Sequence, residues 1–118
     1  MIYVYNRTQE SHQGNNNFYI GRGSPLGNPY THINDRETKA QFILPLREDA
    51  IEAYSRYFDT MYGGNKEFTI LIDEIYTKYK QGEDVWLECY CKPKTCHGDV
   101  IVEKLRARLM REKIKGLK

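Results

Sequence analysis

Short apolar runs alternate with polar segments along this chain in the way expected of small, buried β-strands. Residues 2–5 (IYVY) are apolar and β-prone, and they end at the polar pair Asn6 and Arg7. Residues 18–20 (FYI) form a second short run, and residues 85–91 (VWLECYC) form a third and stronger one. Runs of this length and composition predict three strands.

Three longer segments, 46–62, 66–80 and 97–115, repeat apolar residues at three-and-four spacing, which predicts amphipathic helices. Asn65 is the expected N-cap of the second helix, because its side chain can accept from the backbone of the first turn. Residues 35–43 show a helical pattern of one or two turns. On the third long helix, the residues expected to face the core are Val102, Leu105, Leu109 and Met110.

The order strand, loop, helices, strand and helix predicts one α/β domain over residues 1–118. We expect a small Rossmann-like, three-layer domain with a short, partly parallel sheet and three to four helices. Such folds bind ligands beyond the carboxyl ends of their strands. Those ends are Asn6 with Arg7, and Cys89 with Tyr90 and Cys91.

Composition narrows the class of protein only slightly. The chain of 118 residues suffices for one hydrophobic core, and its net charge of +2 neither demands nor excludes an anionic partner. It contains no apolar run near the roughly 20 residues of a membrane span, and its start lacks the layout of a signal peptide. We therefore expect a cytoplasmic protein without a membrane partner, and leave a homo-oligomer open. Ten tyrosines suit a half-buried surface or a pocket that stacks on flat ligands.

The glycine-rich segment 21–29 (GRGSPLGNP) is the first candidate site. Its glycines can expose backbone N–H groups to an anion such as phosphate, and Arg22 can make bidentate contacts to phosphate or carboxylate. Pro25 and Pro29 stiffen the loop, and Asn28 can accept and donate hydrogen bonds. The spacing matches neither a Walker loop nor the dinucleotide fingerprint. The alternative is a tight connection in which Arg22 pairs with a surface carboxylate.

The second candidate site is the strand–turn–helix segment 87–100 (LECYCKPKTCHGDV). The first turn of the predicted helix attracts anions, and His97 beside it could donate to a ligand or transfer a proton. Cys96 at the helix start would have a lowered thiol pKa. Asp99 could assist, although a carboxylate there also simply favours the positive end of the helix. His97, Cys96 and Asp99 are the candidate catalytic residues.

The clustered cysteines leave a zinc site as an alternative. Cys89, Cys91, Cys96 and His97 are suitable zinc ligands, but their spacing fits a tetrahedral site poorly, and buried cysteines are the other interpretation. We expect no cofactor. The C-terminal segment 104–118 has seven basic residues and one acidic residue, so it could contact nucleic acid or form a solvated helix face. His12, alone in a predicted loop, is expected to be solvated.

The two candidate segments, in this order after a strand that ends in Asn6 and Arg7, resemble the phage and bacterial family called domain of unknown function 4326. The resemblance spans nearly the whole chain. It implies similarity to Rossmann-like nucleotide-binding proteins and an occurrence in phage genomes, hence a host-cytoplasmic location if the gene is viral. The signature positions that the resemblance implies are Asn6, Arg7, Gly21, Arg22, Gly23, Ser24, Gly27, Asn28, Pro29, Cys89, Cys91, Pro93, Cys96, His97 and Gly98.

Three functions follow as expectations. In the first, the protein binds a phosphate-bearing nucleotide or nucleotide-derived small molecule, which a phage protein could use to sequester a host signalling nucleotide against defence. In the second, it is an N-glycosidase, nucleotide transferase or phosphoester hydrolase acting through His97 or Cys96. In the third, it is a zinc-stabilised nucleic-acid-binding module. For the first we expect Arg22 and His97 across one cleft. The expected ligand-binding residues are Asn6, Arg7, Gly21, Arg22, Gly23, Ser24, Gly27, Asn28, Cys89, Tyr90, Cys91, Cys96, His97 and Gly98.

Overall fold

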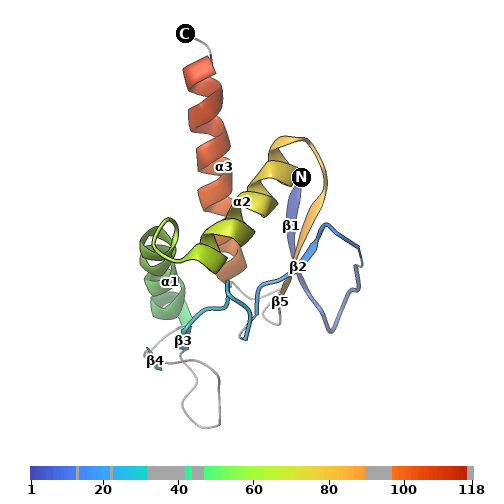
Figure 1. The fold of residues 1–118 in the computed structure, drawn as a ribbon. Helices are drawn as coiled ribbons and strands as arrows, with labels where there is room; N and C mark the ends of the chain where they lie inside the picture. The colour runs from blue at the N-terminus through green and yellow to red at the C-terminus, as the bar shows by residue number, and fades with distance from the viewer. Residues whose placement is uncertain (13, 22, 32–41, 44–46, 90–96, 117–118) are drawn as a thin grey trace.

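Three parallel strands form the central sheet of the protein (Figure 1). The computed structural model describes residues 1–12, 14–21, 23–31, 42–43, 47–89 and 97–116. The strands lie in the order β1 (Ile2–Asn6), β5 (Val85–Cys89), β2 (Asn17–Tyr19). Asn6 is paired with Cys89, and Tyr19 with Glu88. All three strands therefore end at the same edge, and the parallel arrangement predicted from the sequence is confirmed.

The three long helices are α1 (Arg47–Met61), α2 (Lys66–Lys80) and α3 (His97–Gly116), each within one or two residues of the prediction. Asn65 caps α2 as expected, because its side chain accepts a hydrogen bond from the Phe68 amide at 3.0 Å. The helical prediction for Phe42 and Ile43 is wrong. These two residues form β4 (Phe42–Ile43), which pairs in parallel with β3 (Tyr30–Thr31), so pairing with a distant segment overrides the local pattern.

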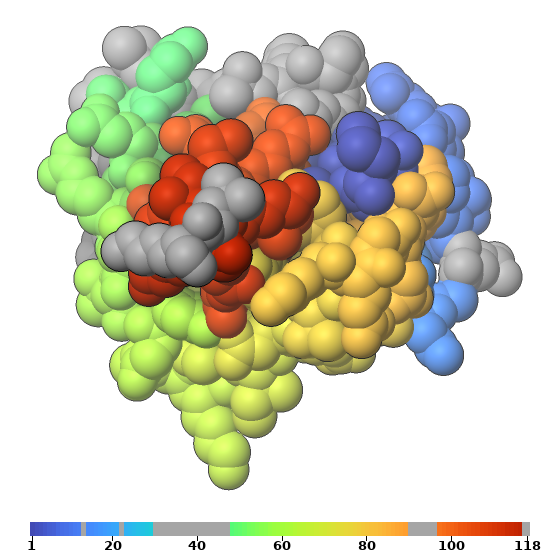
Figure 2. All heavy atoms as spheres, turned by 90° about the horizontal axis from the view of Figure 1, so that it is seen from above, coloured from blue at the N-terminus to red at the C-terminus, as the bar shows by residue number. Residues whose placement is uncertain are grey.

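The C-terminal end of α3 extends beyond the sheet and the other helices (Figure 1), and it comes forward when the molecule is seen from above (Figure 2). Leu105 is buried, while Val102 and Leu109 are partly buried against the core. The prediction that Met110 faces the core is wrong, since this side chain is 64% exposed. The core contacts the side of α3 that carries Leu105 and Leu109, and Met110 lies about a quarter turn beyond Leu109.

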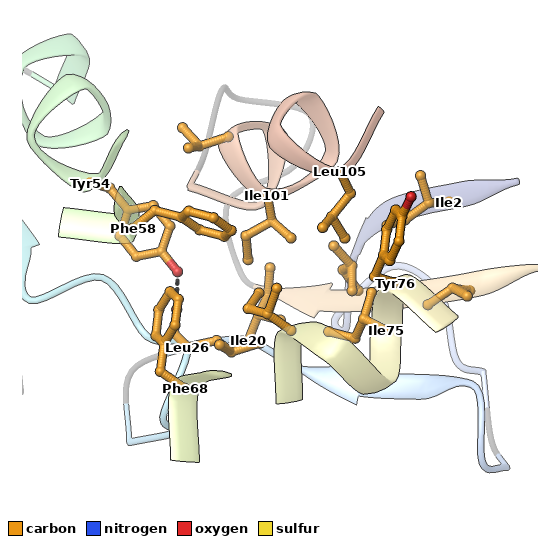
Figure 3. Packing of buried hydrophobic residues seen from close by; sticks show 14 of the residues in the cluster. Ile2, Ile20, Leu26, Tyr54, Phe58, Phe68, Ile75, Tyr76, Ile101 and Leu105 are labelled. Carbon is orange, nitrogen blue, oxygen red and sulfur yellow. Dashed lines mark hydrogen bonds between the residues drawn. The ribbon is translucent and has the colours of Figure 1, made fainter. Parts of the chain in front are cut away.

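One hydrophobic cluster joins all three helices to one face of the sheet (Figure 3). The sheet contributes alternate residues, Val85, Leu87 and Cys89 from β5, as expected when successive side chains point to opposite faces. Trp86 and Glu88 therefore lie on the other face of the sheet. The α/β class and the three helices are confirmed. The described residues form two layers, helices and sheet, and the expected third layer is not among them.

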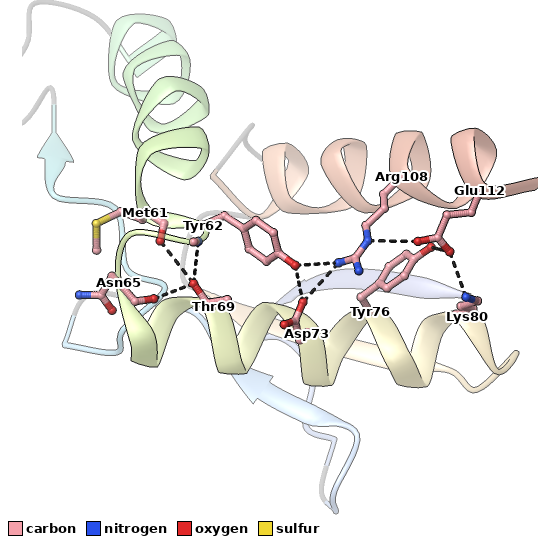
Figure 4. A network of polar contacts seen from close by, with 10 residues as sticks. Met61, Tyr62, Asn65, Thr69, Asp73, Tyr76, Lys80, Arg108 and Glu112 are labelled. Carbon is pink, nitrogen blue, oxygen red and sulfur yellow. Dashed lines mark hydrogen bonds and ion pairs between the residues drawn. The ribbon is translucent and has the colours of Figure 1, made fainter. Parts of the chain in front are cut away.

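A polar network fastens α3 to α2 (Figure 4). The Arg108 guanidinium lies 3.9 Å from the centre of the Tyr76 ring and donates to Asp73 Oδ1 at 3.3 Å and to the Tyr62 hydroxyl at 3.1 Å. The Tyr76 hydroxyl donates to Glu112 Oε2 at 2.7 Å. These contacts fix the position of the cationic helix α3 against α2.

The network also shifts the pKa values of the ionisable side chains that form it. Burial, followed by the hydrogen bond to Glu112, raises the pKa of Tyr76 to about 12. Hydrogen bonds from Tyr76 and Lys80 lower the pKa of Glu112 to about 2. Lys80 also forms an ion pair with Glu112 at 3.0 Å. At neutral pH the carboxylate is therefore charged and the phenol is neutral, the state in which each hydrogen bond is made.

Candidate functional site

The glycine-rich loop that follows Ile20 is folded by its own hydrogen bonds. The Ser24 amide and hydroxyl both donate to the Gly21 carbonyl, at 3.1 and 2.7 Å, and the Gly27 amide donates to the Ser24 carbonyl at 3.0 Å. Gly23 has a φ of +96°, a conformation that residues with a Cβ rarely adopt. The loop is thus a pair of tight turns, each closed by hydrogen bonds within the loop.

Two side-chain contacts hold this loop against α1. The buried Tyr54 hydroxyl donates to the Leu26 carbonyl at 2.7 Å, a contact drawn in Figure 3. The Asn28 side-chain amide donates to the Ala50 carbonyl at 3.3 Å, and Asn28 is itself buried. Leu26 is part of the hydrophobic core. Because these contacts hold both turns in place, the loop has a defined shape on the side that faces the helices.

A pocket of about 260 Å³ lies between the loop, the end of α1 and the start of α2. Its lining residues are Gly23, Ser24, Pro25, Gly27, Asn28, Pro29, Tyr57, Met61, Asn65 and Glu67. The first turn of α2 brings the positive end of a helix dipole to the pocket. Glu67 brings a negative charge to the same wall. Arg22 lies outside the described residues, so its predicted position across a cleft from His97 stays a prediction.

The second candidate segment meets the first directly. His97 is buried at the start of α3, with its Nε2 at 2.5 Å from the carbonyl oxygen of Ile20, the residue before the loop. Since a carbonyl only accepts, Nε2 carries the proton in this hydrogen bond. The His97 ring also packs edge-on against Tyr54, with centroids 5.0 Å apart. His97 therefore supports the start of the loop and is not among the lining residues of the pocket.

Gly98 allows this close approach. A Cβ built at this position would lie 2.8 Å from both Ile20 Cδ1 and Val4 Cγ1, closer than real Cβ contacts come. The first turn of α3 can thus press against β1 and the end of the β2 segment only because residue 98 has no side chain. The sequence analysis singled out Gly98 as a ligand-binding residue, and the structure shows in addition this packing role.

A cluster of polar and aromatic side chains occupies the carboxyl end of the sheet, on the face away from the helices. The Tyr5 hydroxyl lies 2.9 Å from Glu88 Oε1 and 2.5 Å from Asn17 Oδ1. Arg7 Nε is 3.4 Å from Glu88 Oε2, and its guanidinium lies over the Tyr19 ring. Burial and the hydrogen bond to Glu88 raise the pKa of Tyr5 to about 12. Of these residues, the sequence analysis had selected Arg7 alone.

Tyr5, Asn17 and Glu88 were missed because a strand does not reveal by itself which of its faces meets the helices. Their signal was the alternation of polar and aromatic residues with core residues along β1 and β5. The same face carries the stacked rings of Trp86 and His12, with centroids 3.6 Å apart and planes 10° from parallel. The His12 side chain is therefore partly exposed, as expected of a loop histidine, and the Trp86 ring covers one face of its imidazole.

A second pocket, of about 250 Å³, lies between α1, α2 and α3. Two of its cations are already neutralised within the protein. Lys104 pairs with Asp59 at 3.0 Å, and Arg108 with Asp73 at 3.3 Å. A third cation of its lining, Arg111, forms no ion pair with a described residue. This pocket lacks the glycine-rich loop that the sequence singled out, so we take the loop pocket as the candidate site.

The remaining predicted site residues are distributed over the sheet edge and the start of α3. Cys89 is a buried cysteine of the core, and Asp99 lies in the first turn of α3. Tyr90, Cys91 and Cys96 lie outside the described residues. Among the described residues, no three histidine, cysteine, aspartate or glutamate side chains gather into a possible metal site. The zinc hypothesis, which needs Cys91 and Cys96, stays a hypothesis.

No helix in the described part of the chain is long and apolar enough to cross a membrane. The fold and the site define a small α/β domain whose parallel sheet ends beside a preformed glycine-rich loop. The chain belongs to the family described as Domain of unknown function (DUF4326), which it matches over residues 4–107. No curated protein and no solved structure matches the chain.

Proposed function

We propose that the protein binds a phosphate-bearing nucleotide or a nucleotide-derived small molecule in the pocket beside the glycine-rich loop. The observation that carries the proposal is the pocket itself, of about 260 Å³, whose wall is the loop that the sequence singled out. Its volume is at the lower end of the range of small-molecule sites. If the gene is viral, sequestering a host signalling nucleotide is a use that requires binding without turnover.

Three features support an anionic and partly flat ligand. Gly23 and Gly27 line the pocket without a side chain, and the start of α2, with the positive end of its helix dipole, lies at the pocket wall through Asn65 and Glu67. Tyr57 lines the pocket and offers an aromatic ring for stacking. The loop is held by Tyr54 and Asn28 before any ligand arrives, so little conformational entropy is lost on binding.

Glu67 gives a sharp test, because a carboxylate on the pocket wall repels a phosphate. We expect Glu67→Gln to tighten binding of a phosphate-bearing ligand by about 1 kcal/mol, or about fivefold, at the dielectric constant of a wet surface. Glu74→Gln is the matched control, since Glu74 is exposed on the same helix and does not line the pocket.

Isothermal titration against a panel of mononucleotides, dinucleotides, cyclic nucleotides and ADP-ribose-type compounds measures both variants and the parent protein. The absence of binding across the panel would overturn the proposal. Equal tightening by Glu67→Gln and Glu74→Gln would place the ligand elsewhere. Chromatography of the ligand after incubation separates binding from turnover. Turnover that His97→Ala abolishes would support the alternative in which the protein is an enzyme on the same ligand.

A further inference from the structure

The C-terminal half of α3 carries a narrow apolar stripe that faces solvent. Ala107, Met110 and Ile114 follow the three-and-four spacing of a coiled-coil seam. Met110 is 64% exposed and Ile114 is 58% exposed, which makes them two of the four large apolar side chains most exposed among the described residues. The core contacts the opposite side of α3, through Ile101 and Leu105. Met110 and Ile114 are thus left exposed by the described elements, and Ala107 lies at the rim of the pocket between the three helices.

Cations flank the stripe on both sides. Arg106 directly precedes Ala107, Arg111 directly follows Met110, and Lys113 directly precedes Ile114. In a heptad these are the positions, beside the seam, whose charges select the partner helix. The three are exposed, and none forms an ion pair with another described residue. In the sequence, Leu117 and Lys118 continue the same alternation of seam and flanking cation.

The cations elsewhere on α3 behave differently. Lys104 pairs with Asp59, and Arg108 pairs with Asp73 and Glu112. Both line the pocket between α1, α2 and α3, whose rim Ala107 and Arg111 also reach, and Figure 4 shows Arg108 directed at α2. Arg106, Arg111 and Lys113, the charges that border the exposed stripe, thus form no ion pair with a described residue and are all cations. The exposed Glu103 and Lys115 of the same helix also form none, and they lie outside the flanking positions of the stripe.

We propose that this face of α3 docks an amphipathic helix of another protein that carries Glu or Asp on both sides of its apolar seam. Such a helix would cover Met110 and Ile114 and neutralise the flanking cations at the same time. A second copy of this chain is disfavoured, because in either orientation of two α3 helices the flanking positions place cation against cation.

The shape of the stripe favours an acidic helix over the two other anionic partners, a membrane surface and a nucleic acid. A helix that lies on a membrane surface presents a broad apolar face, whereas this stripe is one seam wide and contains only three apolar side chains. Phosphates of a nucleic acid would pair with the cations but would leave Met110 and Ile114 uncovered. A helix whose apolar seam is flanked by Glu or Asp would cover Met110 and Ile114 and would also neutralise the flanking cations.

The test uses two labelled probe peptides of about four heptads with the same Ile and Leu seam. The Glu peptide has Glu at the flanking positions, and the Lys peptide has Lys there. We expect the protein to raise the fluorescence anisotropy of the Glu peptide and not of the Lys peptide, with binding that weakens as salt is added. No binding of the Glu peptide, or equal binding of both, would overturn the proposal.

Charge reversal gives the second readout. Arg111→Glu with Lys113→Glu should weaken the Glu peptide by about tenfold and create binding to the Lys peptide. Lys66→Glu, an exposed change of the same sign on α2, is the matched control and should leave both peptides unchanged. Loss of Glu-peptide binding without a gain of Lys-peptide binding would overturn the proposal.

The apolar stripe is tested separately. Met110→Ser with Ile114→Ser should weaken the Glu peptide by about tenfold or more. Ile70→Ser, which removes an apolar side chain 55% exposed on α2, should not. All these side chains are exposed, so circular dichroism should show folded variants. Anionic vesicles and duplex DNA serve as competing probes, and tighter binding to either than to the Glu peptide would overturn the proposal.

Discussion

Gly98→Ala tests how closely the start of α3 packs against the sheet. The added Cβ would lie 2.8 Å from Ile20 Cδ1 and from Val4 Cγ1, and 3.2 Å from Val4 Cγ2. Ile20 is fully buried and Val4 is partly buried against the core, so movement of either side chain disturbs core packing. The substitution therefore forces the first turn of α3 away from the sheet or forces the two side chains out of their rotamers.

The cost follows from two opposing effects. Adding a methyl group to a packed core costs about 1–3 kcal/mol in strained side chains and backbone shifts. Replacing glycine by alanine in a helix returns up to about 1 kcal/mol, and less than that in a first turn. We expect Gly98→Ala to lower the free energy of unfolding by about 1–2 kcal/mol. That corresponds to a fall in Tm of about 3–8 °C for a domain of this size.

Urea denaturation followed by circular dichroism measures this difference. Gly116→Ala is the matched control, because nothing lies within 4 Å of a Cβ at the other end of the same helix. In a Val4→Ala background, Gly98→Ala should cost about 1 kcal/mol less, since two of the three close contacts are removed. If Gly98→Ala and Gly116→Ala have the same free energy of unfolding, the close packing of α3 against the sheet is refuted.

Three further predictions concern single hydrogen bonds and their ionisation. Tyr54→Phe should cost about 1–2 kcal/mol in urea denaturation, because the buried Leu26 carbonyl loses its donor; a neutral result would contradict the anchoring of the loop. Glu112 has its pKa lowered from 4.5 to about 2, so its stabilisation is present above pH 4.5 and is lost as the pH falls toward 2. The stability difference between the parent protein and Glu112→Gln should shrink over that interval, and a constant difference would speak against the pairing. The pKa values of Tyr5 and Tyr76 are raised from 10 to about 12, so their stabilisation holds below pH 10 and fades toward pH 12; in an absorbance titration these phenols should ionise last, and uniform ionisation near pH 10 would refute this.

The helices and the central strand are the parts of the fold that follow most directly from local pattern. The apolar spacing and the Asn65 cap place α2 at Lys66–Lys80, as observed. The short apolar runs place β1 and β5, and the chain order alone suggested that they run parallel. Local patterns succeed here because burial of one helix face or one strand run requires a periodic sequence.

The candidate site follows from sequence only in part. The glycine-rich loop and the start of α3 stood out, and the structure brings Ile20, before the loop, into contact with His97. The pocket, however, is closed by Tyr57 and Glu67 from α1 and α2, which carry no motif. Their position depends on how the two helices pack. Packing is decided by contacts between segments, so the sequence of one segment alone does not predict it.

The sequence by itself determined the α/β order of elements, the loop chemistry and the alternation along the strands, because these depend on neighbours in the chain. The tertiary structure decided what depends on distant partners. Phe42 and Ile43 became a strand because Tyr30 and Thr31 lie beside them. Met110 became a surface residue because the core contacts another side of α3, the one that carries Leu105 and Leu109.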